Sequence, residues 1–473
     1  MTDFNPLLPP SFNASIHAKR RTSVAAWLQQ HGGGIAILPT APELRRNRDN
    51  VYPYRADSHF YYLTGFTEPE SWLLISDTGH TTLFCRDKDP SQEVWTGYRL
   101  GPDDAPETLG IDNAYPVDEL DELMPELLAN QPAVWYPFAT HAGLESQIEE
   151  WLQLLRGRAR AGILCPQTLR DLCSPLDEMR LIKDEHEITL MRQAGKISAW
   201  GHIRTMQQCA RMIRAGADVR EYHLEAELLH EFCRHGAQDV SFNAIVAAGA
   251  NACVLHYRAG HVPVRPGELV LIDAGCEYQY YAGDITRTFP VNGKFTPAQR
   301  ELYELVLTAQ QAAHNEVKPG NVAKAPHIAA VKVLSQGMLD LGLLNKNTCG
   351  TLDDVIENKD FFRFYMHNTS HWLGLDVHDC GNYVDIHTSA QTIENAATGE
   401  IQKQYPSRPL QAGMVLTLEP GIYVRAAKDV PERFHNIGIR IEDDALVTNS
   451  GSELLTRDVP ITVQEIEKIM ADI

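Results

Sequence analysis

Residues 269–290 read LVLIDAGCEYQYYAGDITRTFP and place two carboxylates, Asp273 and Asp284, at the inner ends of two apolar runs. The run before Asp273 is continuously hydrophobic and the run after Asp284 alternates β-branched and aromatic residues, so both predict strands rather than helix. If the strands form a hairpin that turns near Tyr278 and Gln279, the carboxylates face each other roughly 5 Å apart, where like charges destabilise a sheet. A bound cation would remove that repulsion. Either Asp alone is more simply explained as the solvent-facing end of a strand, so the metal interpretation depends on further ligands.

The composition is that of a soluble globular protein with about two to three domains. The chain has 473 residues, of which 44% are hydrophobic and 22% charged, and its formal net charge is −20. Such a charge argues against nucleic acid, whose recognition needs clustered Lys and Arg, and against anionic membranes. The amino-terminal segment has no basic region followed by an apolar run, and no apolar stretch of about 18 residues occurs, so we expect a cytoplasmic protein. Nine cysteines without a C-x-x-C pair indicate reduced thiols.

The first part of the chain alternates helical and strand-like segments, which predicts an α/β domain over residues 1–177. The strand-like runs are 35–39, 72–76 and 81–85. Two aromatic-rich segments lie among them, YPYRADSHFYYLTGF at 52–66 and EVWTGYRLG at 93–101, and the second carries Trp95 in a polar, exposed setting. Aromatic residues belong to a core more often than to a binding surface, so by themselves these segments predict little about function.

Residues 178–473 interleave helices with strand pairs, which predicts a second domain of the α+β class. Asp184 with Glu187 is the signature of a helix start, and Thr296-Pro297 with Gln299 is another. Further helices are expected over 220–235, which stops at Gly236, and over 326–344.

Two glutamates in this second part, like the two aspartates, place carboxylates on or next to predicted strands. Glu419 follows the strand-like run MVLTL and precedes a proline, which favours an extended conformation. Glu442 lies in NIGIRIEDD, where it shares one strand face with Arg440. The simpler explanation of that face is an Arg–Glu ion pair.

Three histidines, His367, His371 and His378, fall within MHNTSHWLGLDVHDCG. The first two have the spacing of a zinc-protease helix, but NTS is a poor helix and no Glu follows the first His, so we reject that interpretation. The alternation after His371 predicts a strand that returns His378 toward the same site.

Charge counting favours two cations over one. Four carboxylates and one imidazole are too many ligands for a tetrahedral zinc, and four buried negative charges are costly unless they are compensated. Oxygen-rich ligation favours Mn²⁺, with Co²⁺ or Zn²⁺ as possible replacements. Two such ions about 3.5 to 4 Å apart share a water and lower its pKa toward roughly 7, which gives a bridging hydroxide, the nucleophile of a hydrolase.

Taken together, these motifs resemble the aminopeptidase P family of Xaa-Pro aminopeptidases, metallopeptidases with the pita-bread fold. The resemblance covers nearly the whole chain. It includes the two aromatic-rich amino-terminal segments, the stretch quoted at the start, and the strings NAIVAAGANACVLHY, MHNTSHWLGLDVHD, GMVLTLEPGIYV and GIRIEDD.

The resemblance implies a fold, an activity and roles for individual residues. An α/β amino-terminal domain would precede a pita-bread domain that releases the amino-terminal residue from peptides with proline in second position. The residues that would bind two divalent metals are Asp273, Asp284, His371, Glu419 and Glu442. The residues that would serve catalysis are Glu419 as proton acceptor, His367, His378 and Arg440. The residues that would contact substrate are His256, His378, Tyr423 and Trp95, the last from a neighbouring subunit of a homotetramer or homodimer, whose amino-terminal domain would limit access.

Two departures and two rivals accompany the resemblance. Position 242 is Phe where relatives often carry Tyr, and residues 381–411 are longer than the compact loop of some relatives, which suggests a solvated excursion more than a rim of the site. Prolidase, the Xaa-Pro dipeptidase of the same fold, shares the ligands and His378. A non-enzymatic peptide-binding module is the alternative from another class, and intact ligands speak against it.

Overall fold

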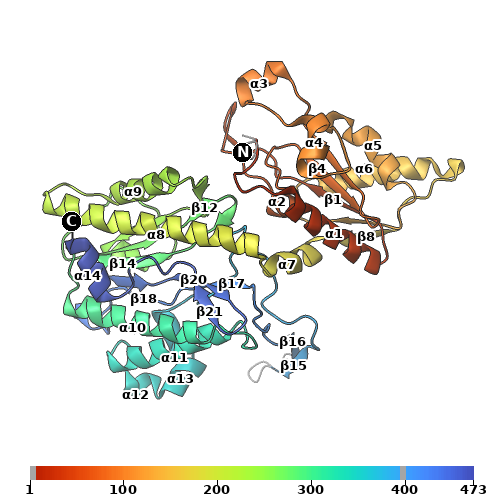
Figure 1. Ribbon diagram of the computed structural model, residues 1–473. Coiled ribbons are helices and arrows are strands. Elements are labelled where there is room, and N and C mark those ends of the chain that lie inside the picture. Colours follow the sequence, from red (N-terminus) through yellow and green to blue (C-terminus); the bar gives the residue numbers. More distant parts are fainter. Residues whose placement is uncertain (1–6, 395–400, 473) are drawn as a thin grey trace. The chain divides into compact units, whose positions relative to one another are not determined.

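The computed structural model describes residues 7–394 and 401–472, and it divides into two units, Met1–Arg180 and Leu181–Ile473. Figure 1 shows strands and helices interleaved along the first unit and several small sheets with long helices in the second. Each unit has its own hydrophobic core. The predicted succession of an α/β part and an α+β part is therefore confirmed. Among the described residues, no helix is long and apolar enough to cross a bilayer.

The first unit is built on a mixed sheet with the strand order β6-β5-β4-β1-β7-β8. The strands are β1 (Ile35–Pro39), β4 (Trp72–Ser76), β5 (Thr81–Cys85), β6 (Asn113–Pro116), β7 (Ala133–Tyr136) and β8 (Thr168–Asp171). The helices are α1 (Ala14–Gln30), α2 (Ser58–Thr64), α3 (Pro90–Thr96), α4 (Gly101–Leu109), α5 (Leu120–Leu128), α6 (Leu144–Gly157) and α7 (Cys173–Leu181), the last crossing the boundary, and β2 (Arg45–Asn47) pairs with β3 (Asn50–Val51). The three strands predicted from sequence are confirmed with their bounds.

The second unit packs helices around several small sheets. Its helices are α8 (Glu185–Arg214), α9 (Glu221–Arg234), α10 (Pro297–Asn315), α11 (Ala325–Asp340), α12 (Lys346–Cys349), α13 (Leu352–Glu357) and α14 (Val463–Ala471). Its strands are β9 (Asp239–Val240), β10 (Ile245–Ala248), β11 (Leu269–Asp273), β12 (Cys276–Tyr278), β13 (Tyr281–Ala282), β14 (Thr286–Pro290), β15 (Gln391–Glu394), β16 (Ile401–Gln404), β17 (Val415–Leu418), β18 (Gly421–Val424), β19 (Ile437–Arg440), β20 (Asp443–Val447) and β21 (Ser452–Leu454).

Helix starts follow the capping signals of the sequence. Asp184 accepts a hydrogen bond from the Glu187 amide at 3.0 Å, and the Glu187 carboxylate accepts one from the Asp184 amide at 3.0 Å, which satisfies two of the free donors at the start of α8. Thr296 and Gln299 form the same box at α10. Helix α11, which the sequence predicted over residues 326–344, ends at Asp340, earlier than expected.

The hairpin that carries the two aspartates differs from the expectation in register. Strands β11 and β14 pair antiparallel, and β12 and β13 turn at Gln279, as predicted. Asp273 lies opposite Thr286, however, so the prediction that it directly opposes Asp284 is wrong. Asp284 precedes β14, in a connection that crosses so closely that a Cβ on Gly275 would lie 1.6 Å from the Gly283 carbonyl oxygen. That approach, open only to glycine, brings the carboxylates together.

The segment after His371 is a loop, so the strand predicted there is wrong. Only Trp372 makes a β-bridge, to Leu416. The Asp379 amide donates to the Trp372 carbonyl at 2.9 Å, and the Asp379 carboxylate accepts from Lys183 Nζ at 2.8 Å, with both side chains 1% exposed. The buried ion pair therefore closes the loop that carries His371 and His378.

Replacing Lys183 by Met should destabilise the protein strongly. The change leaves the Asp379 carboxylate buried without its cation, and breaking a buried pair in this way costs about 3–5 kcal/mol. Chemical denaturation measures the loss in the free energy of unfolding. The matched control is Arg192→Met, which breaks the Arg192–Glu453 pair with side chains 43% and 40% exposed and should cost less than about 1 kcal/mol. Equal losses for the two variants would contradict the assignment.

Candidate metal centre

A cavity of about 1030 Å³ in the second unit brings the predicted ligands together. Its lining includes all five of them, Asp273, Asp284, His371, Glu419 and Glu442. His256, His367, His378 and Arg440 line it as well. Asp273 and Glu442, 169 positions apart in the chain, therefore meet in one place, as a shared site requires.

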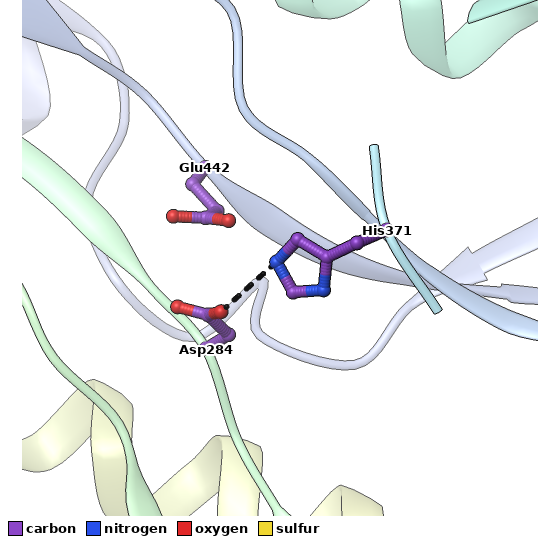
Figure 2. Close-up of side chains that lie close together, drawn as sticks. All are labelled: Asp284, His371 and Glu442. Carbon is purple, nitrogen blue, oxygen red and sulfur yellow. Dashed lines mark ion pairs between the residues drawn. The ribbon is translucent and has the colours of Figure 1, made fainter. Parts of the chain in front are cut away.

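Three of these side chains point at one another. Asp284, His371 and Glu442 each offer a ligand atom, and these atoms lie within 4.8 Å of one another. Figure 2 shows the two carboxylates facing each other with the imidazole at their open side. His371 Nε2 is 3.5 Å from Asp284 Oδ2 and 3.9 Å from Glu419 Oε1, so Glu419 adjoins the same group.

The carboxylates fit divalent cations because the protein leaves them undercompensated. Asp273 Oδ1 and Asp284 Oδ1 are buried and have no hydrogen-bond partner among the described residues. Burial, reinforced by neighbouring carboxylates, raises the pKa of Asp284 and of Glu442 well above the usual range. Burial also raises the pKa of Glu419 to about 7. A donor set of carboxylates and one imidazole, short of positive charge, suits hard or borderline divalent ions.

His371 is oriented for ligation by its own backbone surroundings. Its Nδ1 lies 3.0 Å from the Trp372 carbonyl oxygen, which can only accept, so Nδ1 carries the proton. The Nε2 lone pair is then free and faces the carboxylates. Metal-binding histidines are commonly fixed in this way by a carbonyl on the far side of the ring.

Arg440 holds one wall of the carboxylate cluster. Its Nη2 donates to Asp273 Oδ2 at 2.6 Å and its Nε to Thr286 Oγ1 at 3.1 Å. Thr286 in turn donates to Glu442 Oε2 at 2.6 Å. The simple Arg440–Glu442 pair considered from the sequence is therefore replaced by a chain through Thr286, which positions two carboxylates at once.

Tyr423 lies behind the cavity and supports His367, which lines it. Arg440 Nη1 donates to the Tyr423 hydroxyl at 2.8 Å, and that hydroxyl lies 2.8 Å from His367 Nε2. His367 Nδ1 donates to the Asn368 carbonyl at 2.8 Å. Tyr423 is 1% exposed and is not among the lining residues, so the structure places it as a support for Arg440 and His367. Burial, with Arg440 nearby, lowers the pKa of His367 to about 3, and its ring is neutral.

Of the other predicted residues, two histidines line the cavity and Trp95 does not. The ring of His378 packs edge-on against His371 at 4.4 Å between centroids, and His256 lines the cavity. Trp95 lies in α3 of the first unit, 83% exposed, and does not line the cavity. Phe242 does line it and presents a ring without a hydroxyl.

Sequence reasoning missed two supporting residues. Thr286 shares a strand face with Thr288 and lies two positions after Asp284, so the alternation DITRT contained a signal for it. Asp444 is fully buried and its Oδ2 accepts from the Asp284 amide at 3.0 Å. It follows Glu442 by two positions, but its role depends on a contact 160 residues away that periodicity does not reveal.

Part of the segment 381–411 forms a wall of the cavity, so its interpretation as a solvated excursion is wrong there. The Ala323 amide donates to the Arg408 carbonyl at 2.7 Å, and the Lys324 amide to Ser407 Oγ at 3.2 Å. These bonds join the start of α11 to the segment. The outer wall, as we call it, consists of Ala323, Lys324, His327, Tyr383, Val384, Lys403, Gln404, Tyr405 and Ser407. Residues 395–400 lie outside the described residues.

The fold and this cluster define the class of the protein as a metal-dependent hydrolase. The profile of metallopeptidase family M24 matches residues 189–449, and that of the amino-terminal domain of aminopeptidase P matches residues 17–135. Xaa-Pro aminopeptidases of Haemophilus influenzae and Escherichia coli are 43% and 42% identical to this chain, and each alignment covers 96% of both proteins. The solved structure of Pseudomonas aeruginosa aminopeptidase superposes with a TM-score of 0.89 at 41% identity over 97% of this chain and 98% of that one.

The chain therefore belongs to metallopeptidase family M24, in its aminopeptidase P group. The predicted pita-bread fold and the recognition of the family are confirmed by these matches. The curated relatives reported above carry the name Xaa-Pro aminopeptidase, so the prolidase alternative is not favoured.

Replacing Thr286 by Val should weaken metal binding with little change in shape. The variant removes the donor to Glu442 Oε2 and the acceptor of Arg440 Nε, and loss of such supporting bonds typically costs 10- to 100-fold in metal affinity. Titration with Mn²⁺ followed by calorimetry measures the effect. Thr288→Val is the matched control, because Thr288 is equally buried on β14 but its hydroxyl, among the described residues, hydrogen-bonds to the main chain of Arg440 and to no carboxylate. Equal affinities in the two variants would contradict the role of Thr286.

Proposed function

We propose that this protein releases the amino-terminal residue from peptides whose second residue is proline, with the help of two divalent cations. The observation that carries the proposal is the convergence of Asp284, His371 and Glu442 in a cavity that Asp273 and Glu419 also line. The relatives support it, since Escherichia coli aminopeptidase P has been solved with the inhibitor Pro-Leu and, zinc-substituted, with product.

Asp273, Asp284, His371, Glu419 and Glu442 would hold the two ions, and Asp284 and Glu442 face each other beside His371. When bound, the cations supply Lewis-acid chemistry: they polarise the scissile carbonyl group and activate water for attack. We propose Mn²⁺ as the native ion, because oxygen ligands dominate the donor set.

Glu419 is the proposed proton acceptor. It follows β17 directly, and its amide donates to the Thr369 carbonyl at 2.8 Å, which fixes its backbone beside the histidine segment. His371 and His367 flank its carboxylate at 3.9 and 3.6 Å. A carboxylate held there can take the proton of the attacking water and pass it to the leaving proline nitrogen.

Recognition of proline has to rely on shape. The nitrogen of an Xaa-Pro bond carries no hydrogen, so a site cannot identify it by accepting a hydrogen bond. We propose that His378 and Arg440 border the proline ring and that His256 contacts the peptide, since all three line the cavity. Trp95 reaching from a neighbouring subunit, a homotetramer or homodimer, and a cytoplasmic location stay predictions.

A peptide series together with Glu419→Gln tests the activity. The wild-type protein should cleave an Xaa-Pro-Xaa tripeptide and leave both Xaa-Pro and Xaa-Ala-Xaa largely intact, as measured by release of the free first residue. Glu419→Gln should lower kcat by at least about 10²-fold, the usual contribution of a general base, while bound metal measured by mass spectrometry changes little.

The control for this variant is Glu453→Gln, an exposed glutamate outside the cavity, which should keep full activity. Cleavage of the dipeptide alone would indicate a prolidase. Metal binding without cleavage of any peptide would indicate the non-enzymatic module. Undiminished turnover in Glu419→Gln would remove that residue from the mechanism.

The stabilisation that metal gives should grow with pH. Burial raises the pKa of Glu419 to about 7 and those of Asp284 and Glu442 well above their usual range, whereas in the unfolded chain such groups titrate near about 4. At a pH between the unfolded and folded pKa values, these carboxyl groups bind more protons in the folded metal-free protein than in the unfolded chain. Their contribution to the free energy of unfolding therefore falls as pH rises, and at higher pH a metal ion has fewer protons to displace when it binds. We expect Mn²⁺ to raise the melting temperature more at about pH 8 than at about pH 5. An equal rise in melting temperature at the two pH values would contradict this expectation.

A further inference from the structure

A buried line of hydroxyl groups connects the core behind the metal centre to one histidine of the outer wall. The Tyr365 hydroxyl lies 2.6 Å from Thr369 Oγ1, and Thr369 Oγ1 lies 2.9 Å from His327 Nδ1. Tyr365 and Thr369 are 0% exposed, and His327 lies in the first turn of α11. Neither Tyr365 nor Thr369 has another side-chain hydrogen-bond partner among the described residues.

Counting hydrogens along this line fixes the direction of each bond. A buried phenol needs an acceptor for its one hydrogen, and the available acceptor is Thr369 Oγ1, so Tyr365 donates to Thr369. The Thr369 hydrogen then also needs an acceptor, and His327 Nδ1 is the remaining one within reach. His327 Nδ1 therefore accepts. The opposite arrangement, with a proton on Nδ1, would leave a buried hydroxyl hydrogen unpaired, which costs about 1–3 kcal/mol.

The far side of the His327 ring belongs to the cavity. With Nδ1 accepting, a neutral ring carries its proton on Nε2. Burial, with Lys324 nearby, lowers the pKa of His327, which keeps the ring neutral. His327 lines the cavity, and its Nε2 is neither enclosed by protein atoms nor paired among the described residues. The wall thus presents an N–H donor of fixed identity and direction.

We propose that His327 is a substrate-contacting residue whose Nε2–H donates to a main-chain carbonyl oxygen of the bound peptide, with Thr369 and Tyr365 as the positioning residues that set its tautomer. This inference rests on the proposed function. The tertiary amide nitrogen of an Xaa-Pro bond has no hydrogen to donate. The main-chain groups that a peptide always offers for hydrogen bonding around proline are therefore its carbonyl oxygens. A donor on the outer wall therefore suits this class of substrate.

Steady-state kinetics on the metal-loaded protein tests the contact. His327→Leu should raise KM for an Xaa-Pro-Xaa tripeptide about 5- to 10-fold, the usual size of one hydrogen bond, with kcat and metal content near wild type. His327→Gln, whose amide N–H can reach a similar point, should recover part of the loss. The control is Ser335→Ala on the same helix, which removes a buried hydroxyl away from the cavity and should leave KM unchanged. An unchanged KM in His327→Leu, or a loss explained by lost metal, overturns the proposal.

The tautomer is read directly in the wild-type protein. In Zn²⁺-loaded protein labelled with ¹⁵N-histidine, the His327 signals should show an unprotonated Nδ1 and a protonated Nε2, and Thr369→Val, which removes the hydroxyl that donates to Nδ1, should allow the second tautomer to appear. A proton on Nδ1 in the wild type overturns the inference. This measurement needs no turnover, so it separates the failure of the inference from failure of the proposed function, which would appear as a wild-type protein that cleaves no Xaa-Pro peptide.

Discussion

Burial of like charges in one cavity is the constraint on which the rest of this structure depends. Asp273, Asp284 and Glu442 are each less than a tenth exposed, and Glu419 adjoins them. Arg440 brings one positive charge to the cluster, which does not balance four carboxylates. A protein that keeps such a set must either hold protons there or hold cations, and the unpaired oxygens of Asp273 and Asp284 favour cations.

The fold meets this constraint by crossing chains at close range. Gly275 and Gly283 let the two aspartate-bearing segments touch, and a β-bridge joins Thr286 to Glu442. Around the carboxylates, each supporting hydrogen bond has a defined direction. Arg440 donates to the Tyr423 hydroxyl, which donates to His367, and His371 donates to the Trp372 carbonyl oxygen. The tautomers of His367 and His371 are therefore set by neighbours that do not titrate near neutral pH.

Local signals in the sequence were sufficient for much of the fold. The capping boxes of α8 and α10, the strands β1, β4 and β5, and the hairpin turn at Gln279 all follow from patterns within a few residues. Resemblance then named the five side chains that the cavity collects. The failures concern contacts that strand alternation does not report. The loop at His378 depends on the pair of Lys183 with Asp379, 196 positions away, and the register of Asp273 depends on the close backbone approach of Gly275 to Gly283.

The same distinction separates the floor of the cavity from its outer wall. The floor, by which we mean Asp273, Asp284, His371, Glu419 and Glu442, consists of ionisable side chains whose chemistry restricts the choice of residue, so its motifs are recognisable in isolation. The outer wall is assembled from the start of α11 and the segment 381–411 through main-chain bonds such as that from Ala323 to Arg408, which any side chain permits. Wall residues can therefore vary while the floor stays fixed. Selectivity among Xaa-Pro peptides should then reside in the wall, where His327 is held by hydroxyls that the floor chemistry does not require.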